Sequence, residues 1–503
     1  MHLATHVNPE EVIEQLRNDP EESHRQHVFT LNAVATRTAY STRYASSEEI
    51  PKFRIPQLGA SAEAVYRLLR DELDLDGIPN LNMASFVGTF MEREAQQLLV
   101  ENIGKNLADA DEYPALMDLH ARCISMIANM WHPQPGEQPI GTATTGSSEA
   151  IQLGGLAMKR RWQEKRRAEG KDTSKPNILM GANAQVALLK FARYFDVEAR
   201  ILDVSENSHY RLDPNDIKKN VDENTIGIFV ILGSTYTGHY EPVEELSRIL
   251  DQVQEEHGWD IPIHVDAASG GFIAPFTHAG AGGSKWDFEL PRVHSINVSG
   301  HKFGLVYVGL GWIIWRDRAY LPKDLIFELH YLGGTEESFG LNFSRPGIQV
   351  IGQYYNLIRL GFDGYREVME NCLRNARLLS KALERTGYVK QEAISLLLRA
   401  KQYIIPNYPL PPKTDNIEIL RVVVRESMSG DLIDKLISDI VEVTERVMTS
   451  EPIDVAVLQS RPTSLARRHG RLETKLPAKK ITKVKAGEKA RHPMAKGGHR
   501  SVC

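Results

Sequence analysis

The chain has 503 residues, 42% hydrophobic and 25% charged, which is typical of a soluble globular protein with two domains and terminal extensions. The formal net charge of −5 combines an acidic body, −16 over residues 1–460, with a basic tail, +11 over residues 461–503. The longest apolar runs are too short to span a membrane, which takes roughly 20 residues, and the three cysteines lack the spacing of a disulfide framework or a cysteine-based metal site.

The N-terminal region, residues 1–134, is predicted to be mainly helical, with a loop at 75–90 ("LDGIPNLNMASFVGTF") between two helical stretches. Its first residues become acidic and polar within ten positions, unlike a secretory signal. We therefore expect a cytoplasmic protein.

From about residue 135 to 345, short apolar runs alternate with helix-like segments. This pattern predicts βαβ units in a largely parallel sheet with helices on both faces. We expect strands at 177–181, 199–204, 226–232, 261–267, 295–300 and 311–315, and helices at 148–169, 185–195 and 241–256. Ligands of such sheets bind beyond the carboxyl ends of the strands, so polar residues that end an apolar run are candidates for chemistry.

The C-terminal part begins with a long predicted helix at 352–387. A strand at 417–426 ("IEILRVVVRE") and an amphipathic helix at 430–448 follow it. The tail from Arg461 is rich in Lys, Gly and Pro and has no aromatic residue, which predicts disorder.

The segment "TATTGSSEA" closes a strand and opens a helix at Gly146, Ser147 and Ser148. Free backbone N–H groups at a helix N-terminus, together with two hydroxyl groups, form an anion cup suited to phosphate. A plain helix cap is the competing interpretation, and it is favoured when this segment is taken alone.

Two further strand ends carry charged residues. Asp266 ends the strand in "PIHVDAASGGF", where a carboxylate beside small residues can hold a protonated ring nitrogen; the alternative is an Asp that starts a Gly-rich turn. Lys302 follows the strand in "SINVSGHKFG". It is a candidate for Schiff-base chemistry, because a desolvated lysine keeps its amine neutral; the alternative is a lysine that reaches the surface.

Together the anion cup, the acid and the lysine match one cofactor, pyridoxal 5'-phosphate. It needs an anchor for its phosphate, an acid for its pyridinium nitrogen and a lysine for its aldehyde. A chance agreement of all three features on one sheet is improbable.

Long segments also resemble the glutamate decarboxylase family of the plant, fungal and bacterial type, a branch of the aspartate-aminotransferase-like (fold type I) pyridoxal phosphate enzymes. The similarity is carried by "GSSEA", "KFARYFDVE", "GSTYTGHYE", "HVDAASGGF", "INVSGHKFGLVY" and "LNFSRPGIQVIGQYYNLIRLGF", and it extends to "LDGIPNLNMASFV" and "IGKNLADADEYP". It implies an α/β fold with a mainly parallel seven-stranded sheet and a small α+β C-terminal domain. It also implies decarboxylation of L-glutamate to 4-aminobutanoate (GABA) and carbon dioxide, without a metal.

The same resemblance implies roles for individual residues. Lys302, Asp266 and His301 form the catalytic set. The cofactor is surrounded by Ser147, Ser148, Gln185, Thr235, Asp266, Ala268, Ser299, His301 and Lys302, with Ser344 approaching from a second subunit, which implies a homodimer or larger homo-oligomer. The substrate pocket is formed by Ser85, Phe86, Asn106, Asp109 and Arg425. For His301, packing beside the lysine is the alternative to a phosphate contact.

We predict an N-terminal helical segment (1–60), a large cofactor-binding domain (61–360), a small domain (361–455) and a basic tail (456–503). After "KALERTGYV" about thirty residues of the family pattern are missing, which puts the small domain and the position of Arg425 in doubt. A cofactor-binding but impaired or regulatory isoform therefore remains an alternative to an active enzyme, as does an aminotransferase.

The basic tail offers a calmodulin-binding segment as one interpretation, since basic and apolar residues mix in "KLPAKKITKVKAGEKA". Pro477 and Gly487 interrupt any helix there, and no Trp or Phe is present as an anchor. A solvated tail is the favoured interpretation, and we expect no nucleic-acid partner.

Overall fold

The computed structural model describes residues 55–57, 59–88, 90–108, 110–277, 283–329, 336–385 and 391–449. The chain divides into two units, Met1–Asp76 with Pro452–Cys503, and Gly77–Glu451. In the first unit the structure describes α3 (Ala62–Leu73), whose N-terminus is capped by the Ser61 hydroxyl, which accepts from the Ala64 N–H at 3.2 Å. Among the described residues, no helix combines the length and apolar character that crossing a membrane requires.

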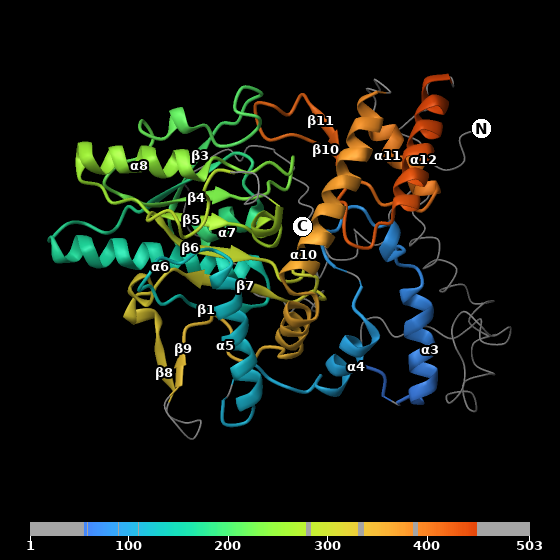
Figure 1. Cartoon of the computed structure of the whole chain (residues 1–503), viewed down its shortest axis with the longest axis horizontal. Helices are drawn as coiled ribbons and strands as arrows, with labels where there is room; N and C mark the ends of the chain where they lie inside the picture. The colour runs from blue at the N-terminus through green and yellow to red at the C-terminus, as the bar shows by residue number, and fades with distance from the viewer. Residues whose placement is uncertain are drawn as a thin grey trace, which may run out of the picture. The chain divides into compact units, whose positions relative to one another are not determined.

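A seven-stranded sheet lies at the centre of the second unit, which confirms the predicted fold class (Figure 1). Its order is β1-β7-β6-β5-β4-β2-β3, and only β7 is antiparallel to its neighbours. The strands are β1 (Ile140–Thr144), β2 (Asn177–Gly181), β3 (Glu198–Leu202), β4 (Thr225–Ile231), β5 (Ile263–Asp266), β6 (Val293–Val298) and β7 (Gly311–Trp315). Because β1 and β6 both run opposite to β7, the carboxyl ends of β1, β4, β5 and β6 share one edge of the sheet.

Helices cover both faces of this sheet because its strands are apolar on both sides. In β7, Ile313 and Trp315 pack in a cluster with α6, whereas Trp312 and Ile314 belong to the main core that includes α5 and α10. The helices on the sheet are α5 (Pro114–Asn129), α6 (Ser147–Ala168), α7 (Val186–Tyr194), α8 (Val243–His257) and α10 (Ile348–Glu384). The predicted helices at 148–169, 185–195 and 241–256 correspond to α6, α7 and α8.

The remaining elements are short or lie beside the sheet. They are α4 (Arg93–Glu101), α9 (Ala274–Thr277), the hairpin of β8 (Phe327–Leu329) and β9 (Glu336–Ser338), α11 (Gln391–Ala400), the hairpin of β10 (Asn407–Pro409) and β11 (Glu418–Leu420), and α12 (Gly430–Thr449). Single 3₁₀ turns occupy Pro79–Leu81, Pro214–Asp216, Gly270–Phe272, Arg318–Tyr320 and Lys323–Leu325. A separate apolar cluster joins α11 and α12 to the end of α10 and to Met83.

Two predicted elements differ from the structure. The helix predicted at 352–387 begins earlier, at Ile348, and is interrupted at Gly361, whose φ of 61° lies in the left-handed region that favours glycine. The strand predicted at 417–426 ends at Leu420, because the following residues bond elsewhere: the Val423 N–H donates to the Met83 carbonyl at 2.9 Å.

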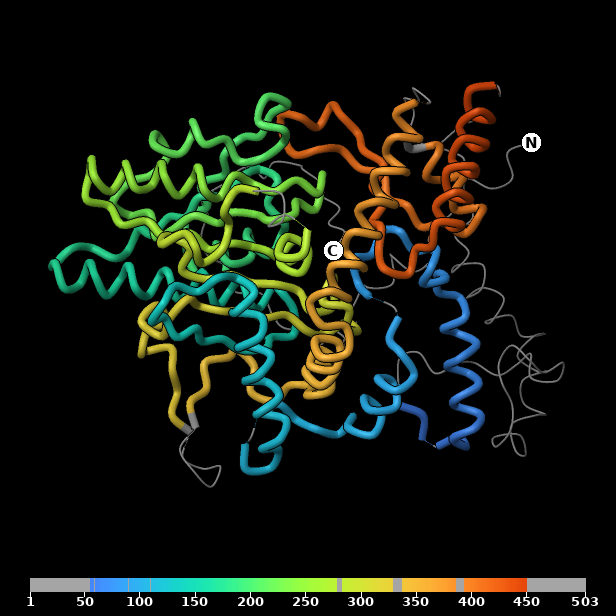
Figure 2. The backbone as a smooth tube through the Cα atoms, in the orientation of Figure 1, coloured from blue at the N-terminus to red at the C-terminus, as the bar shows by residue number. Residues whose placement is uncertain are grey.

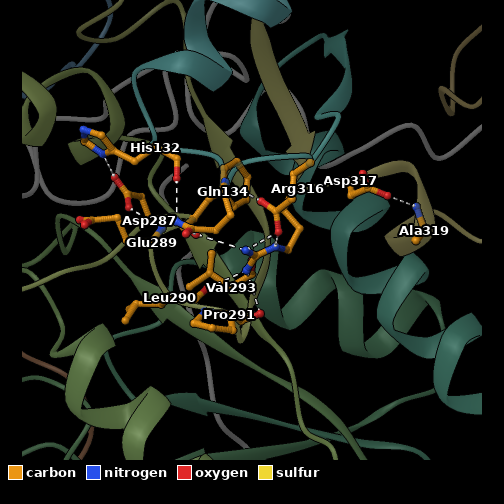
Figure 3. Close-up of polar contacts among 12 residues, drawn as sticks. His132, Gln134, Asp287, Glu289, Leu290, Pro291, Val293, Arg316, Asp317 and Ala319 are labelled. Atoms are coloured by element: carbon orange, nitrogen blue, oxygen red, sulfur yellow. Dashed lines mark hydrogen bonds and ion pairs between the residues drawn. The ribbon is translucent and has the colours of Figure 1, made fainter.

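At the edge of the sheet opposite the carboxyl ends of the parallel strands, Arg316 follows β7 and bonds to the segment that precedes β6 (Figure 3). Its buried guanidinium pairs with Glu137 at 2.6 Å and donates to the carbonyls of Leu290 and Pro291, both at 2.8 Å. In the same view, His132 Nδ1 contacts Asp287 Oδ2 at 2.8 Å. Three potential metal-ligand atoms from His132, Asp287 and Glu289 lie within 4.8 Å of one another, but nothing beyond their proximity indicates an ion.

Candidate active site

Lys302 lies on a tight turn that follows β6, and α10 fixes this turn from behind. The side chains of Gln353 and Asn356 donate to the carbonyls of Gly304 and Leu305, at 3.1 and 2.6 Å. A Cβ added at Gly304 would lie 2.5 Å from the Gly300 carbonyl oxygen and 2.8 Å from Gln353 Oε1, so glycine is required for this approach. The turn that carries Lys302 is therefore fixed between β6 and α10. This explains why a lysine occurs in a segment that is otherwise apolar.

The Lys302 amine is held in surroundings that favour its neutral form. Nζ donates to Ser269 Oγ at 3.3 Å and lies 5.1 Å from the centre of the Phe86 ring. Burial lowers the pKa of the Lys302 ammonium; Asp266 raises it, and Arg421 lowers it further. A lysine of this kind is available as a nucleophile toward an aldehyde.

Asp266 ends β5 and is 5% exposed. Its Oδ1 accepts from the Asn297 amide at 2.9 Å and from the Ala268 N–H at 3.2 Å. Asn297 Oδ1 in turn contacts His264 Nε2 at 2.7 Å, and burial lowers the pKa of His264 to about 4. The neutral His264 therefore donates to Asn297, and the chain of bonds orients the carboxylate at the sheet edge.

The predicted anion cup forms where β1 meets α6. Helix α6 begins at Ser147, and Ser147 Oγ lies 2.7 Å from Ser299 Oγ, from the turn after β6. Ser148 is exposed at the same helix N-terminus. The buried Glu149 stabilises the loop from within, because its Oε2 accepts from both the N–H and the hydroxyl of Thr145, at 2.8 and 2.9 Å. The free N–H groups and hydroxyls suit an anion.

His301 lies against this cup, since a Cβ added at Gly146 would be 3.4 Å from His301 Cε1. Burial and the neighbouring Lys302 lower the pKa of His301 to about 4. The Leu310 N–H donates to Nδ1 at 3.3 Å, so the single proton of the neutral ring is on Nε2. His301 therefore offers one N–H donor beside the cup.

Phe86 lies beside both Lys302 and Arg421, on a loop (residues 82–88) that several hydrogen bonds hold in place. The Val87 N–H donates to Ser85 Oγ at 3.1 Å, and the Gly88 N–H donates to the His301 carbonyl at 2.9 Å. The Phe86 ring lies near the Lys302 amine and near the Arg421 guanidinium, whose Cζ is 4.8 Å from the ring centre.

Arg421 is the site residue that sequence reasoning missed. Its terminal nitrogens donate to the carbonyls of Thr235 at 3.2 Å and Ala84 at 2.7 Å, and its Nε, like that of Arg425, is buried without a hydrogen-bond partner among the described residues. Arg425, which was expected to bind substrate, is 1% exposed and donates to the backbone carbonyls of Val87 and Pro79, at 2.6 and 2.9 Å. Arg425 holds the loop that carries Phe86, while Arg421 lies near Lys302.

The other predicted residues have contacts of their own. Gln185 caps α7, its Oε1 accepting from the Ala187 N–H at 2.6 Å. Asn106 donates to Ser344 Oγ at 3.3 Å, and its Oδ1 accepts from the Arg345 N–H at 2.9 Å. The side chains of Gln185 and Asn106 are therefore each bonded to neighbouring groups of the chain. Asp109 lies outside the described residues.

These groups fit pyridoxal phosphate. The cup formed by Ser147 and Ser299 suits the phosphate, the buried Asp266 suits the ring nitrogen, and the desolvated Lys302 suits the aldehyde. All lie at or just after the carboxyl ends of β1, β5 and β6, at one edge of the sheet, where open α/β sheets bind ligands.

Comparison with known proteins agrees with this geometry. Residues 82–393 match the model of the pyridoxal-dependent decarboxylase conserved domain. A glutamate decarboxylase of Saccharomyces cerevisiae is 48% identical, with 79% of this chain and 80% of that protein covered. A glutamate decarboxylase of Solanum lycopersicum is 47% identical, with 82% and 86% covered.

Solved structures extend the likeness to the fold. The glutamate decarboxylase of Lactobacillus brevis CGMCC 1306 superposes with a TM-score of 0.78 at 38% identity, covering 82% of this chain and 98% of that one. A sphingosine-1-phosphate lyase of Burkholderia pseudomallei K96243 superposes with a TM-score of 0.67 at 20% identity, covering 80% and 95%, which shows a shared fold alone.

Proposed function

The chain belongs to the pyridoxal-dependent decarboxylases, in their glutamate decarboxylase group, and we propose that Lys302 is the residue that carries its cofactor. Its reaction converts L-glutamate to 4-aminobutanoate and carbon dioxide. The observation that carries the assignment of Lys302 is a buried lysine with a lowered pKa on a rigid turn, beside Asp266 and Phe86.

Other residues of the chain are assigned to binding the cofactor and orienting the substrate. Bound pyridoxal phosphate supplies the electron sink that accepts the pair released as carbon dioxide leaves. Asp266 would stabilise its protonated ring nitrogen, and Ser147, Ser299 and the Nε2–H of His301 would donate to its phosphate. Residues that hold the substrate in one orientation would select decarboxylation over other reactions.

Arg421 is the group we assign to a substrate carboxylate, in place of Arg425. Its guanidinium lowers the pKa of the Lys302 ammonium, and its Cζ lies 4.8 Å from the centre of the Phe86 ring that Lys302 also contacts. Arg425 is 1% exposed, and its terminal nitrogens donate to the backbone carbonyls of Val87, Pro79 and Asn82. A partly exposed arginine beside the Lys302 amine suits a substrate carboxylate.

The test of Lys302 is chemical. Reduction of the holoprotein with borohydride, followed by peptide mapping, is expected to place the pyridoxyl label on the peptide that contains Lys302. Lys302→Ala is expected to lower decarboxylation by about a thousandfold or more, because no other group replaces the covalent step. Label on a different lysine would falsify the assignment.

We also propose that the active form is a homodimer or a larger homo-oligomer in which Asn106 and Ser344 serve the site of a second copy. Their mutual bond keeps the two side chains together, and the neighbouring Leu341 and Phe343 are 44% and 43% exposed. Exposed apolar residues beside a polar pair are typical of an interface.

Subunit complementation tests this arrangement. Lys302→Ala chains and Asn106→Ala/Ser344→Ala chains are each expected to be weak alone and to regain activity when refolded together, because a mixed dimer contains one intact site. No recovery, with dimers formed, shows that these residues act within their own chain.

The interpretation of the tail stays a prediction, since residues 450–503 lie outside the described residues. The cytoplasmic location also stays a prediction. Calmodulin or polyanion binding is tested with the full chain and with a chain lacking residues 461–503; we expect no difference. Cell fractionation tests the cytoplasmic location.

A further inference from the structure

We propose that Tyr408 is a positioning residue that holds the Arg421 guanidinium in the orientation required for the substrate carboxylate. The proposal rests on the role assigned to Arg421 above, and it concerns a residue of the small C-terminal hairpin rather than of the large sheet. Tyr408 acts through Arg421 and is not itself expected to touch the reacting atoms.

Tyr408 and Arg421 share one acceptor. The Tyr408 hydroxyl donates to the Thr235 carbonyl at 3.3 Å, and Arg421 Nη1 donates to the same carbonyl at 3.2 Å. Burial raises the pKa of Tyr408, so its hydroxyl stays protonated and remains a donor at neutral pH. The phenol therefore fixes the carbonyl to which the guanidinium is attached.

Two aromatic rings also confine the guanidinium. Arg421 Cζ lies 4.8 Å from the centre of the Phe86 ring and 5.6 Å from that of Tyr408. The Tyr408 ring is supported by Tyr236 in an edge arrangement, with centroids 5.8 Å apart. Contacts with both rings restrict the rotation of the long arginine side chain before substrate binds. The entropy lost when the side chain is immobilised on binding is therefore smaller, which favours affinity.

The backbone places the two residues together. β10 and β11 pair in the register Tyr408 to Ile419, and Arg421 follows β11, its N–H donating to the Pro406 carbonyl at 3.1 Å. The loop between these strands reaches the region of β3, where Lys413 pairs with Asp203 (Figure 2). The hairpin thus positions Arg421 and Tyr408 beside Thr235, which follows β4 at the carboxyl edge of the sheet.

Binding of glutarate to the holoenzyme isolates this effect, because glutarate has both carboxylates but no amine and cannot react. Tyr408→Phe is expected to weaken glutarate inhibition and to raise the KM for glutamate by about threefold to tenfold, with a smaller change in kcat. Tyr408→Ala is expected to do more, since the ring is lost as well. The matched control Tyr236→Phe keeps the supporting ring and is expected to change either constant less than about twofold.

A double-mutant cycle with Arg421→Lys separates positioning from general structural support. If Tyr408 acts through Arg421, Tyr408→Phe weakens glutarate binding in the wild-type chain but adds nothing in the Arg421→Lys chain. Additive losses, or a Tyr408→Phe variant that binds like the wild type, overturn the proposal. Unchanged binding by Arg421→Lys alone rejects the carboxylate assignment itself, and with it the proposal. Cofactor absorbance and melting temperature are recorded for each variant, and if Tyr408→Ala loses cofactor, Tyr408→Phe decides.

Discussion

At the scale of single residues, the orientation of Asp266 depends on side chains behind it. The Asn297 amide donates to Asp266 Oδ1, and the amide is itself fixed by His264, whose Nδ1 contacts Ser295 Oγ at 2.7 Å. All of these side chains are buried. A buried network of this kind restricts the Asp266 carboxylate to one orientation.

Asn297→Ala is therefore expected to lower kcat by about tenfold while the cofactor stays bound, because Asp266 loses a bond worth about 1 to 3 kcal/mol and can turn from the ring nitrogen. Steady-state kinetics and cofactor absorbance measure the two effects. Ser295→Ala, at the far end of the same network, is the control and should change kcat less than about threefold. Equal losses from both variants would show that the network stabilises the core without orienting the acid.

At the scale of elements, the two arginines of "LRVVVRE" have different tasks. Arg425→Met removes donors from the carbonyls of Pro79, Asn82 and Val87 and is expected to cost about 3 kcal/mol of unfolding free energy. Arg421→Met is expected to cost less stability but to raise the KM for glutamate by at least about tenfold. Urea denaturation and kinetics on both variants compare these outcomes, and a reversed pattern returns the substrate role to Arg425.

The same segment shows what sequence alone leaves undecided. In a continuous strand residues four apart share a face, so Arg421 and Arg425 are equivalent candidates. They differ because the strand ends at Leu420 and the Val423 N–H bonds to Met83, a residue more than three hundred positions away. By contrast, Lys302, Asp266 and the cup at Ser147 each lie at or just after the end of a strand of one sheet, and strand order alone brings them to one edge.

The break in α10 permits a local test of backbone strain. Gly361 has a φ of 61°, and a Cβ added there would meet no atom within 4 Å, so Gly361→Ala is expected to cost about 1 to 2 kcal/mol through its backbone alone. Gly104, which has equal space and no positive φ, is the matched control, and its alanine variant is expected to lie within about 0.5 kcal/mol of the wild type. Chemical denaturation distinguishes them, and equal stabilities contradict the strain argument.

At the scale of the whole molecule, composition and strand periodicity were sufficient to predict the mainly parallel sheet, because apolar runs buried on both faces leave few other arrangements. The hairpin that carries Arg421 was harder to predict. Its strands have three residues each. The resemblance predicts that about thirty residues of the family pattern are missing before it. The hairpin nevertheless reaches the site, since Arg421 bonds to Thr235 and Ala84 of the large core. The hairpin therefore makes the contacts with the large core on which the proposed role of Arg421 depends.

Several histidines buried in this core make its stability depend on pH. Burial, with a contribution from Arg345, lowers the pKa of His120 to about 3, and burial lowers those of His264 and His301 to about 4. An unfolded histidine titrates near 6.5. Between these values the unfolded chain binds protons that the folded chain does not, so stability falls as the pH falls.

The urea midpoint is therefore expected to decrease from pH 7 to pH 5, with each such histidine contributing at most about 1.4 kcal/mol per pH unit below 6.5. His120→Gln should reduce this slope, because glutamine does not bind a proton in this pH range. The substitution should be tolerated, since the glutamine carbonyl can still accept the Ala143 N–H that His120 Nε2 accepts at 2.8 Å. His257→Gln, at a side chain 49% exposed, is the control and should leave the slope unchanged. If His120→Gln keeps the wild-type slope, the acid sensitivity of the fold arises from other groups.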